Sequence, residues 1–231
     1  MDHQIPLPLR LDPELTFDRF VSGPNEEAVA FLRHAASGNG PRQIFIHGGK
    51  GIGKSHLLQA TVMESAKFLR TAMVLDLSDL DQLTPEVFEG LGQIDLVCLD
   101  NVDAVSGRPL WEEAFFAFYH EIEDLEGCLI LASQRAPEAL PYGLPDLQSR
   151  MQSGLIFKLQ PLSEEETQLA LVESAQSIGL DLPPAAARYL MRHERRELGS
   201  LLQLLDRLDK ASLADQRKLT IPFIKKVLGH A

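Results

Sequence analysis

Short apolar runs alternate with amphipathic segments over the first two thirds of the chain. The apolar runs, each of strand length, lie at 44–46, 72–75, 94–99, 128–132 and 155–159. Helical spacing of apolar residues marks 26–36, the stretch after residue 55, a short piece at 85–89, and 111–125. The pattern predicts an α/β fold, a three-layer αβα domain whose mostly parallel sheet is covered on both faces.

The pattern changes character at residue 161. Ser163 begins a helix with acidic residues in its first turn, and further helices are expected over 183–193, 198–213 and 221–228. The pattern predicts no strand in this part. We therefore expect an N-terminal arm and linker at 1–22, the αβα domain at 23–160, and a small all-helical domain at 161–231.

The first residues read as an extended arm. Pro6 and Pro8 at alternate positions disfavour a helix, so the apolar residues between and around them share one side. Such a stripe, preceded by a glutamine amide, suits insertion into a groove of a partner through Gln4, Ile5, Leu7 and Leu9. A tail that folds over its own domain explains the residues equally well. Downstream, Phe17 and Phe20 can pack beside a ligand or simply fasten this segment to the core.

Composition narrows the class of protein. The 231 residues are 45% hydrophobic without a membrane-length apolar run or an export signal, so we expect a cytoplasmic protein without a membrane partner. Cys98 and Cys128 lie inside apolar runs and are expected to be reduced core residues. A formal net charge of −11 argues against non-specific coating of nucleic acid, so any DNA contact should be local or made through a partner.

One glycine-rich segment fits the phosphate-loop pattern G-x-x-x-x-G-K-[ST]. It follows an apolar strand, precedes a helix, and consists of Gly48, Gly49, Lys50, Gly51, Ile52, Gly53, Lys54 and Ser55. Its backbone N–H groups can point at a polyphosphate at the positive end of the helix. Lys54 would reach the outer phosphates and the Ser55 hydroxyl would hold Mg²⁺, which predicts a nucleotide site.

Asp100 ends an apolar strand in the manner of the second nucleotide motif, where a carboxylate supports Mg²⁺ beside Ser55. The next residue is Asn101, where an ATPase of this type would have a glutamate that polarises the attacking water. Loss of a general base typically lowers a rate about a hundred- to ten-thousand-fold. Asp103 would be a poor substitute because it lies further along the chain. We expect nucleotide binding with weak intrinsic hydrolysis, so whether the protein is itself an enzyme stays open.

Polar residues elsewhere have two interpretations each. Ser133 and Gln134 follow a strand expected beside that of Asp100, so they can reach the terminal phosphate or cap a turn. Arg150 precedes the last strand and can enter a neighbour's nucleotide site or form a surface ion pair. Arg195 and Arg196 can fold back onto phosphates or cap a helix.

These motifs, taken in order, resemble the AAA+ family of the bacterial replication initiator DnaA. The resemblance covers about residues 16–229 and includes 16–21, the phosphate loop, Leu96–Asp100, Ser133 with Gln134, and Ser149 to Met151. It implies an AAA+ domain with a helical lid, nucleotide contacts from Gly48 to His56 and from Asp100 and Ser133, and an arginine finger at Arg150. The lid arginine of the family corresponds to Arg196, or to Gly199 if the sequence is counted back without gaps.

Two departures from the initiator narrow the resemblance. The sequence ends at Ala231 without the initiator's DNA-binding domain, so we expect it not to bind origin boxes. The arm from Gln4 to Leu9 resembles the peptide that docks in the sliding clamp, the β subunit, of DNA polymerase III. Together with Asn101, these features resemble the DnaA-related regulatory inactivators. That resemblance implies a clamp-bound protein, functional with ADP (or ATP) and Mg²⁺, that presents Arg150 to ATP-bound DnaA and stops re-initiation of replication.

Two other hypotheses come from different functional classes. A self-sufficient ATPase of helicase-loader type would turn over ATP unaided, which Asn101 disfavours. A nucleotide-regulated DNA-binding adaptor would use cationic residues of the helical domain, namely Arg188, Arg192, Arg217, Lys218, Lys225 and Lys226. Acidic residues between these positions favour a solvated helical face instead. Self-association through Arg150 is a further expectation left open.

Overall fold

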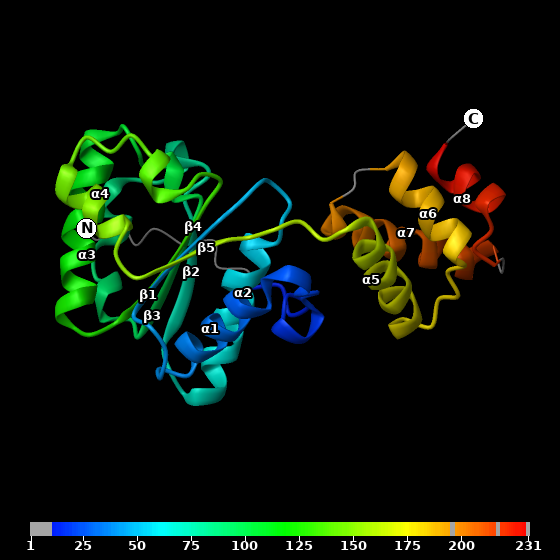
Figure 1. The fold of residues 1–231 in the computed structure, drawn as a ribbon, viewed down its shortest axis with the longest axis horizontal. Helices are drawn as coiled ribbons and strands as arrows, with labels where there is room; N and C mark the ends of the chain where they lie inside the picture. The colour runs from blue at the N-terminus through cyan, green and yellow to red at the C-terminus, as the bar shows by residue number, and fades with distance from the viewer. Residues whose placement is uncertain (1–10, 195–196, 216–217, 230–231) are drawn as a thin grey trace, which may run out of the picture. The chain divides into compact units, whose positions relative to one another are not determined.

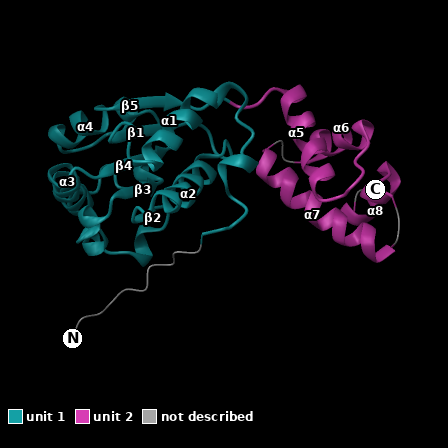
Figure 2. Cartoon of the chain, turned by 90° about the horizontal axis from the view of Figure 1, so that it is seen from below, with its two compact units in different colours: residues 1–160 teal, residues 161–231 magenta. Residues whose placement is uncertain are grey.

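The computed structural model describes residues 11–194, 197–215 and 218–229. The chain divides into two compact units, residues 1–160 and residues 161–231 (Figure 2). The first unit holds the sheet and its covering helices, and the second holds helices (Figure 1).

The sheet of the first unit has five strands, and every neighbouring pair is parallel. In the order β2-β3-β4-β1-β5 they are Ala72–Asp76, Leu96–Asp100, Cys128–Ser133, Gln43–His47 and Leu155–Lys158. This confirms the predicted parallel sheet and the pairing of the Asp100 strand with the strand that ends at Ser133. Because the strands are parallel, their carboxyl ends meet at one edge, where His47 is in register with Ser133.

Helices α1 (Glu26–Ala36) and α2 (Lys54–Ser65) cover one face of the sheet. Ile44 and Ile46 of β1 are fully buried in this layer, with Leu32 of α1 and Leu57 of α2. Such non-alternating burial is typical of a central parallel strand.

Helices α3 (Pro109–Asp124) and α4 (Pro145–Met151) cover the opposite face (Figure 2). Phe45 of β1 is buried here, in the same cluster as Phe115 of α3 and Leu147 of α4. The sequence pattern did not predict α4, because two prolines and a glycine precede this short segment.

The connections contain short 3₁₀ turns. The segment expected as a helix near 85–89 is one of them, and they span Phe17–Arg19, Gly23–Asn25, Ala66–Phe68, Leu80–Gln82, Pro85–Phe88, Leu91–Gln93, Val102–Ala104 and Pro137–Ala139. Asn25 precedes α1, but its side chain makes no cap hydrogen bond. Instead it bonds the backbone N–H and C=O of Gln160, fastening the start of α1 to the end of the unit.

The second unit consists of α5 (Glu164–Ser177), α6 (Pro184–His193), α7 (Leu198–Asp215) and α8 (Ile221–Leu228). The helix α5 begins where the sequence predicted, and Ser163 and Glu166 form a reciprocal capping box at its start. The described residues of this unit contain no strand, and Leu171, Leu190, Leu201 and Ile224 lie in its core. The predicted helical domain is confirmed.

Both cysteines are buried free thiols on neighbouring strands. Burial raises the pKa of Cys98 well above its ordinary value and raises that of Cys128 to about 11. Both side chains are therefore protonated core residues at neutral pH. Separately, no helix in the described part of the chain is both long enough and apolar enough to cross a membrane.

Candidate functional site

The predicted phosphate loop joins β1 to α2 at the carboxyl edge of the sheet. Gly51 and Gly53 have φ of +74° and +98°, a left-handed conformation that favours glycine. Lys54 is only 7% exposed, and its Nζ donates to the carbonyl oxygens of Gly48 at 2.8 Å and Gly49 at 2.9 Å. Burial lowers the Lys54 pKa, while Asp100 and Asp103 oppose that effect. The loop therefore curls around a desolvated cation.

Phe20 lies directly against this loop. A Cβ atom added to Gly53 would stand 2.6 Å from Cε2 of Phe20, and the Phe20 ring meets the His56 ring edge-on at 5.3 Å. His56 Nε2 is 2.8 Å from the Thr16 carbonyl oxygen and therefore donates to it, and burial lowers the pKa of His56. Phe17 instead packs in the core under Arg33 and fastens this segment to it, whereas a contact of Phe20 with a ligand stays a prediction.

Ser55 and Asp100 meet beside the loop. The Ser55 hydroxyl donates to Asp100 Oδ2, and the Asn101 backbone N–H donates to Oδ1 at 2.9 Å. Burial raises the pKa of Asp100, with a contribution from nearby Asp76, while the Ser55 hydrogen bond opposes it. A hydroxyl and a single carboxylate are oxygen ligands that suit Mg²⁺ held jointly with phosphates, so these residues fit the predicted ion. The described residues contain no larger cluster of metal-binding side chains.

The side chain of Asn101 is held by a neighbouring carboxylate. Its backbone is left-handed, with φ of +56°, and its side-chain amide donates to Asp76 Oδ1 at 2.8 Å. The chain then forms a 3₁₀ turn instead of staying extended, and Asp103 accepts from the Ser133 hydroxyl at 3.1 Å and the Gln134 N–H at 3.3 Å. Ser133 also accepts the N–H of Arg135 at 3.0 Å, a turn contact. A contact of Ser133 with a phosphate stays a prediction.

Arg150 lies near the end of α4, far from the phosphate loop. Its backbone carbonyl accepts from the side chain of Gln43, the first residue of β1, at 2.7 Å, whereas the loop follows the last residue of β1. Its guanidinium forms a 2.8 Å ion pair with Glu123 and stands 5.4 Å from the centre of the Tyr119 ring. Arg150 is thus at the amino edge of the sheet, opposite its own nucleotide site. The surface ion pair that the sequence allowed does exist.

Several predicted residues lie outside the described residues. They are Gln4, Ile5, Leu7 and Leu9 of the arm, Arg195 and Arg196 of the helical unit, and Arg217. The alternative lid position, Gly199, is exposed in the first turn of α7.

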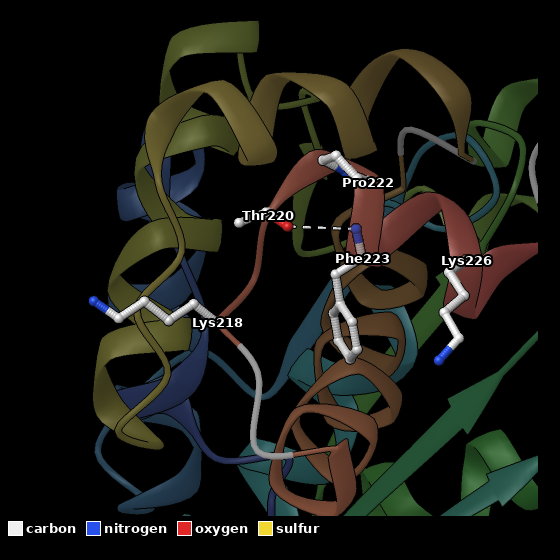
Figure 3. Close-up of a pocket in the computed structure, with 5 residues that line it drawn as sticks. All are labelled: Lys218, Thr220, Pro222, Phe223 and Lys226. Atoms are coloured by element: carbon white, nitrogen blue, oxygen red, sulfur yellow. Dashed lines mark hydrogen bonds between the residues drawn. The ribbon is translucent and has the colours of Figure 1, made fainter.

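The cationic residues near α8 do not converge on one ligand. A pocket of about 280 Å³ is lined by Lys218, Thr220, Pro222, Phe223 and Lys226 (Figure 3). In Figure 3 the ammonium groups of Lys218 and Lys226 lie on opposite sides of the Phe223 ring. Lys226 is also neutralised by Asp215 at 3.0 Å. The described structure therefore shows no anion site shared by these two lysines, and the DNA-binding adaptor stays a prediction.

Comparison with known proteins identifies the family. Residues 11–158 match the family of the bacterial DnaA ATPase domain, which covers the whole sheet and the phosphate loop. The chain belongs to the bacterial DnaA ATPase-domain family. Residues 164–228 in turn match the lid domain of Hda, so the helical unit is a lid of that type. A DnaA-related AAA+ core with an Hda-type lid indicates a role connected with the initiation of replication.

Solved structures agree with this assignment. Domain III of the Thermotoga maritima replication initiation protein DnaA superposes with a TM-score of 0.80 at 24% identity, over 95% of this chain and 98% of that one. AMPPCP-bound DnaA from Aquifex aeolicus gives a TM-score of 0.72 at 25% identity, over 88% and 73%. The RuvB branch migration motor of Thermotoga maritima, at 17% identity and a TM-score of 0.70 over 95% and 72%, shares the AAA+ fold.

Sequence reasoning missed three buried polar residues near Arg150. Gln43, Glu112 and Tyr119 are 8%, 1% and 6% exposed, and each bonds groups on or beside α4. The available signal was weak, because Glu112 and Tyr119 fall on the otherwise apolar face of α3.

Proposed function

We propose that this protein is a nucleotide-bound regulator of the replication initiator DnaA. While the regulator is bound to the sliding clamp, it inserts Arg150 into the ATP site of DnaA. The observation that carries this proposal is the location of Arg150 at the sheet edge opposite its own phosphate loop. Family membership and the Hda-type lid support the choice of partner.

The protein's own site holds an adenine nucleotide in this proposal. Lys54 and the loop N–H groups bind the phosphates, and Phe20 and His56 fix the loop from outside. Ser55 and Asp100 hold Mg²⁺, which neutralises phosphate charge when bound. The AMPPCP bound to the Aquifex DnaA supports the class of ligand. Since the Asn101 amide cannot accept a proton and donates to Asp76, we expect slow hydrolysis and retention of ADP.

Arg150 acts in the partner's site. An always-charged planar guanidinium donates two hydrogen bonds to a phosphate and stabilises charge in the transition state of phosphoryl transfer. Such a residue supplied in trans raises hydrolysis by about a thousand- to a hundred-thousand-fold. DNA is engaged only indirectly, because the clamp carries it. The clamp contact from Gln4 to Leu9 adds effective concentration to a weak AAA+ contact.

The test mixes ATP-loaded DnaA, clamp loaded on DNA, and this protein, and measures the ATP that remains on DnaA. The wild type should accelerate hydrolysis only when clamp is present. Arg150→Ala should lose the acceleration while it keeps clamp binding and nucleotide, and deletion of Gln4 to Leu9 should abolish clamp binding without unfolding the protein. Brisk ATP turnover by this protein alone, or unchanged DnaA-bound ATP in the full mixture, would reject the proposal.

A further inference from the structure

The helix that carries Arg150 depends on outside support. Helix α4 has only seven residues, and an isolated helix of that length is not stable in water. Leu147 and Met151 anchor its middle and end in the core. Polar contacts fix its two ends, directly from α3 at the start and through intermediate residues bonded to α3 at the end.

Glu112 of α3 fixes the start of α4. Its side chain is buried, and its Oε2 accepts the backbone N–H groups of Gly143 at 2.8 Å and Leu144 at 3.1 Å. Leu144 is the residue immediately before the first turn of α4, where a negative charge is favourable. The other oxygen accepts the N–H of Gly107 at 2.7 Å, so the carboxylate is satisfied by three donors.

Tyr119 fixes the end of α4 and lies beneath its cation. Its hydroxyl donates to Gln43 Oε1 and lies 3.2 Å from Ser153 Oγ. Gln43 and Ser153 each donate to the Arg150 carbonyl oxygen at 2.7 Å, so this network pins the backbone of Arg150. The Tyr119 ring face, 5.4 Å from the guanidinium carbon, adds a cation–π contact.

Glu123 binds the guanidinium itself. It lies one helical turn after Tyr119, and its Oε1 is 2.8 Å from a terminal nitrogen of Arg150. The side chains are 37% exposed for Arg150 and 48% exposed for Glu123, so a solvent-borne or partner-borne anion can reach the pair. A carboxylate offers the guanidinium the same kind of acceptor as a phosphate oxygen.

Glu112, Tyr119 and Glu123 are spaced by seven and four residues and so occupy one stripe of α3. We propose that this stripe governs the arginine finger: Glu112 and Tyr119 are positioning residues for Arg150, and Glu123 holds its guanidinium until a phosphate of the partner's nucleotide displaces it. The inference rests on the proposed function of Arg150 and adds its regulation. In the absence of a partner, Glu123 keeps the Arg150 side chain ordered. Binding to the partner's nucleotide then exchanges the Glu123 carboxylate for a phosphate oxygen.

The experiment titrates each variant into ATP-loaded DnaA with clamp on DNA, and fits the maximal hydrolysis rate and the half-saturating concentration separately. Tyr119→Phe should lower the maximal rate about two- to tenfold, because it removes one hydrogen-bonded hydroxyl, with an unchanged half-saturating concentration. Glu123→Gln should raise the maximal rate up to about fivefold, because an exposed ion pair no longer competes. That gain should shrink at high salt.

The chain offers matched controls. Tyr142→Phe also removes a buried tyrosine hydroxyl, one without a hydrogen-bond partner among the described residues. Asp124→Asn removes a neighbouring exposed carboxylate of α3. Both should match the wild type. If Tyr119→Phe fails to fold, Ser153→Ala tests the same network from an exposed residue and should also lower only the maximal rate.

The outcomes separate this inference from the proposed function. If Arg150→Ala abolishes stimulation but Tyr119→Phe and Glu123→Gln behave like the wild type, the inference fails alone. A lower rate with Glu123→Gln, or equal losses with Tyr119→Phe and Tyr142→Phe, would overturn it as well. If Arg150→Ala retains full stimulation, the proposed function fails first.

Discussion

The two edges of the sheet are built differently. At the carboxyl edge, Lys54 and Asp100 are buried, and Gly51 and Gly53 take left-handed conformations. At the amino edge, Arg150 keeps a partly exposed side chain on a short helix, paired with an exposed carboxylate. The first arrangement suits a ligand held by buried groups, and the second presents a cation outward. A strand of five residues, roughly 13 Å long, separates them.

This contrast implies that the two edges can be disabled separately. A variant at the carboxyl edge should change nucleotide affinity or the stability of the loop, because its contacts are local. A variant at Arg150 should change only the effect on a partner.

The largest expected effect at the carboxyl edge comes from Lys54→Ala. The substitution removes a charged hydrogen-bond donor from the phosphates, so ADP affinity should fall about ten- to 150-fold. Fluorescent ADP titration measures it, with Lys67→Ala, an exposed lysine just beyond the end of α2, as the control. Arg150→Ala should leave the affinity unchanged. Equal affinities for wild type and Lys54→Ala would remove the evidence that this edge holds phosphates.

A smaller effect is expected from Gly53→Ala. Alanine would have to adopt φ near +98°, and its Cβ would stand 2.6 Å from the Phe20 ring, so the free energy of unfolding should fall by about 1–3 kcal/mol. Urea denaturation measures the change. Gly49→Ala is the matched control, because a Cβ there meets no atom within 4 Å. Equal stability of the two variants would mean that Phe20 does not clamp the loop.

The smallest effect concerns pH. Burial depresses the pKa of folded His56, so the unfolded chain binds that proton first and stability is lost as pH falls through the folded value. Between about pH 7 and pH 5 the free energy of unfolding should drop, and His56→Gln should remove roughly 1 kcal/mol or less of that drop. His47, whose pKa burial also lowers, should contribute to the drop that remains.

Local patterns were enough to predict most of the sheet. The apolar runs around Ile44, Leu99 and Ile130 are buried on both faces, so their composition alone marks them as central strands. The phosphate loop could also be predicted from the sequence, because its glycines and Lys54 are required at fixed spacing.

Features that depend on contacts between residues far apart in the sequence could not be predicted from it. Helix α4 has little intrinsic stability, and the N–H groups at its start are bound by Glu112, more than thirty positions away in the sequence. The sequence shows that Asn101 lacks the carboxylate of a general base, but it does not predict the left-handed backbone of Asn101 or its hydrogen bond to Asp76 at the end of the neighbouring strand β2. The network of Gln43, Tyr119 and Ser153 joins three separate segments, and no spacing rule connects them.

The two buried cysteines make this protein suitable for site-specific labelling through an added cysteine. Cys98 and Cys128 are the only cysteines in the sequence, and both are buried with raised pKa values, so thiol-reactive dyes should leave the native protein unmodified. A single engineered cysteine near Gly49 or near Asp124 would then carry the sole label. A label at the first position could report nucleotide binding and a label at the second could report partner binding. Neither would require prior substitution of the two buried cysteines.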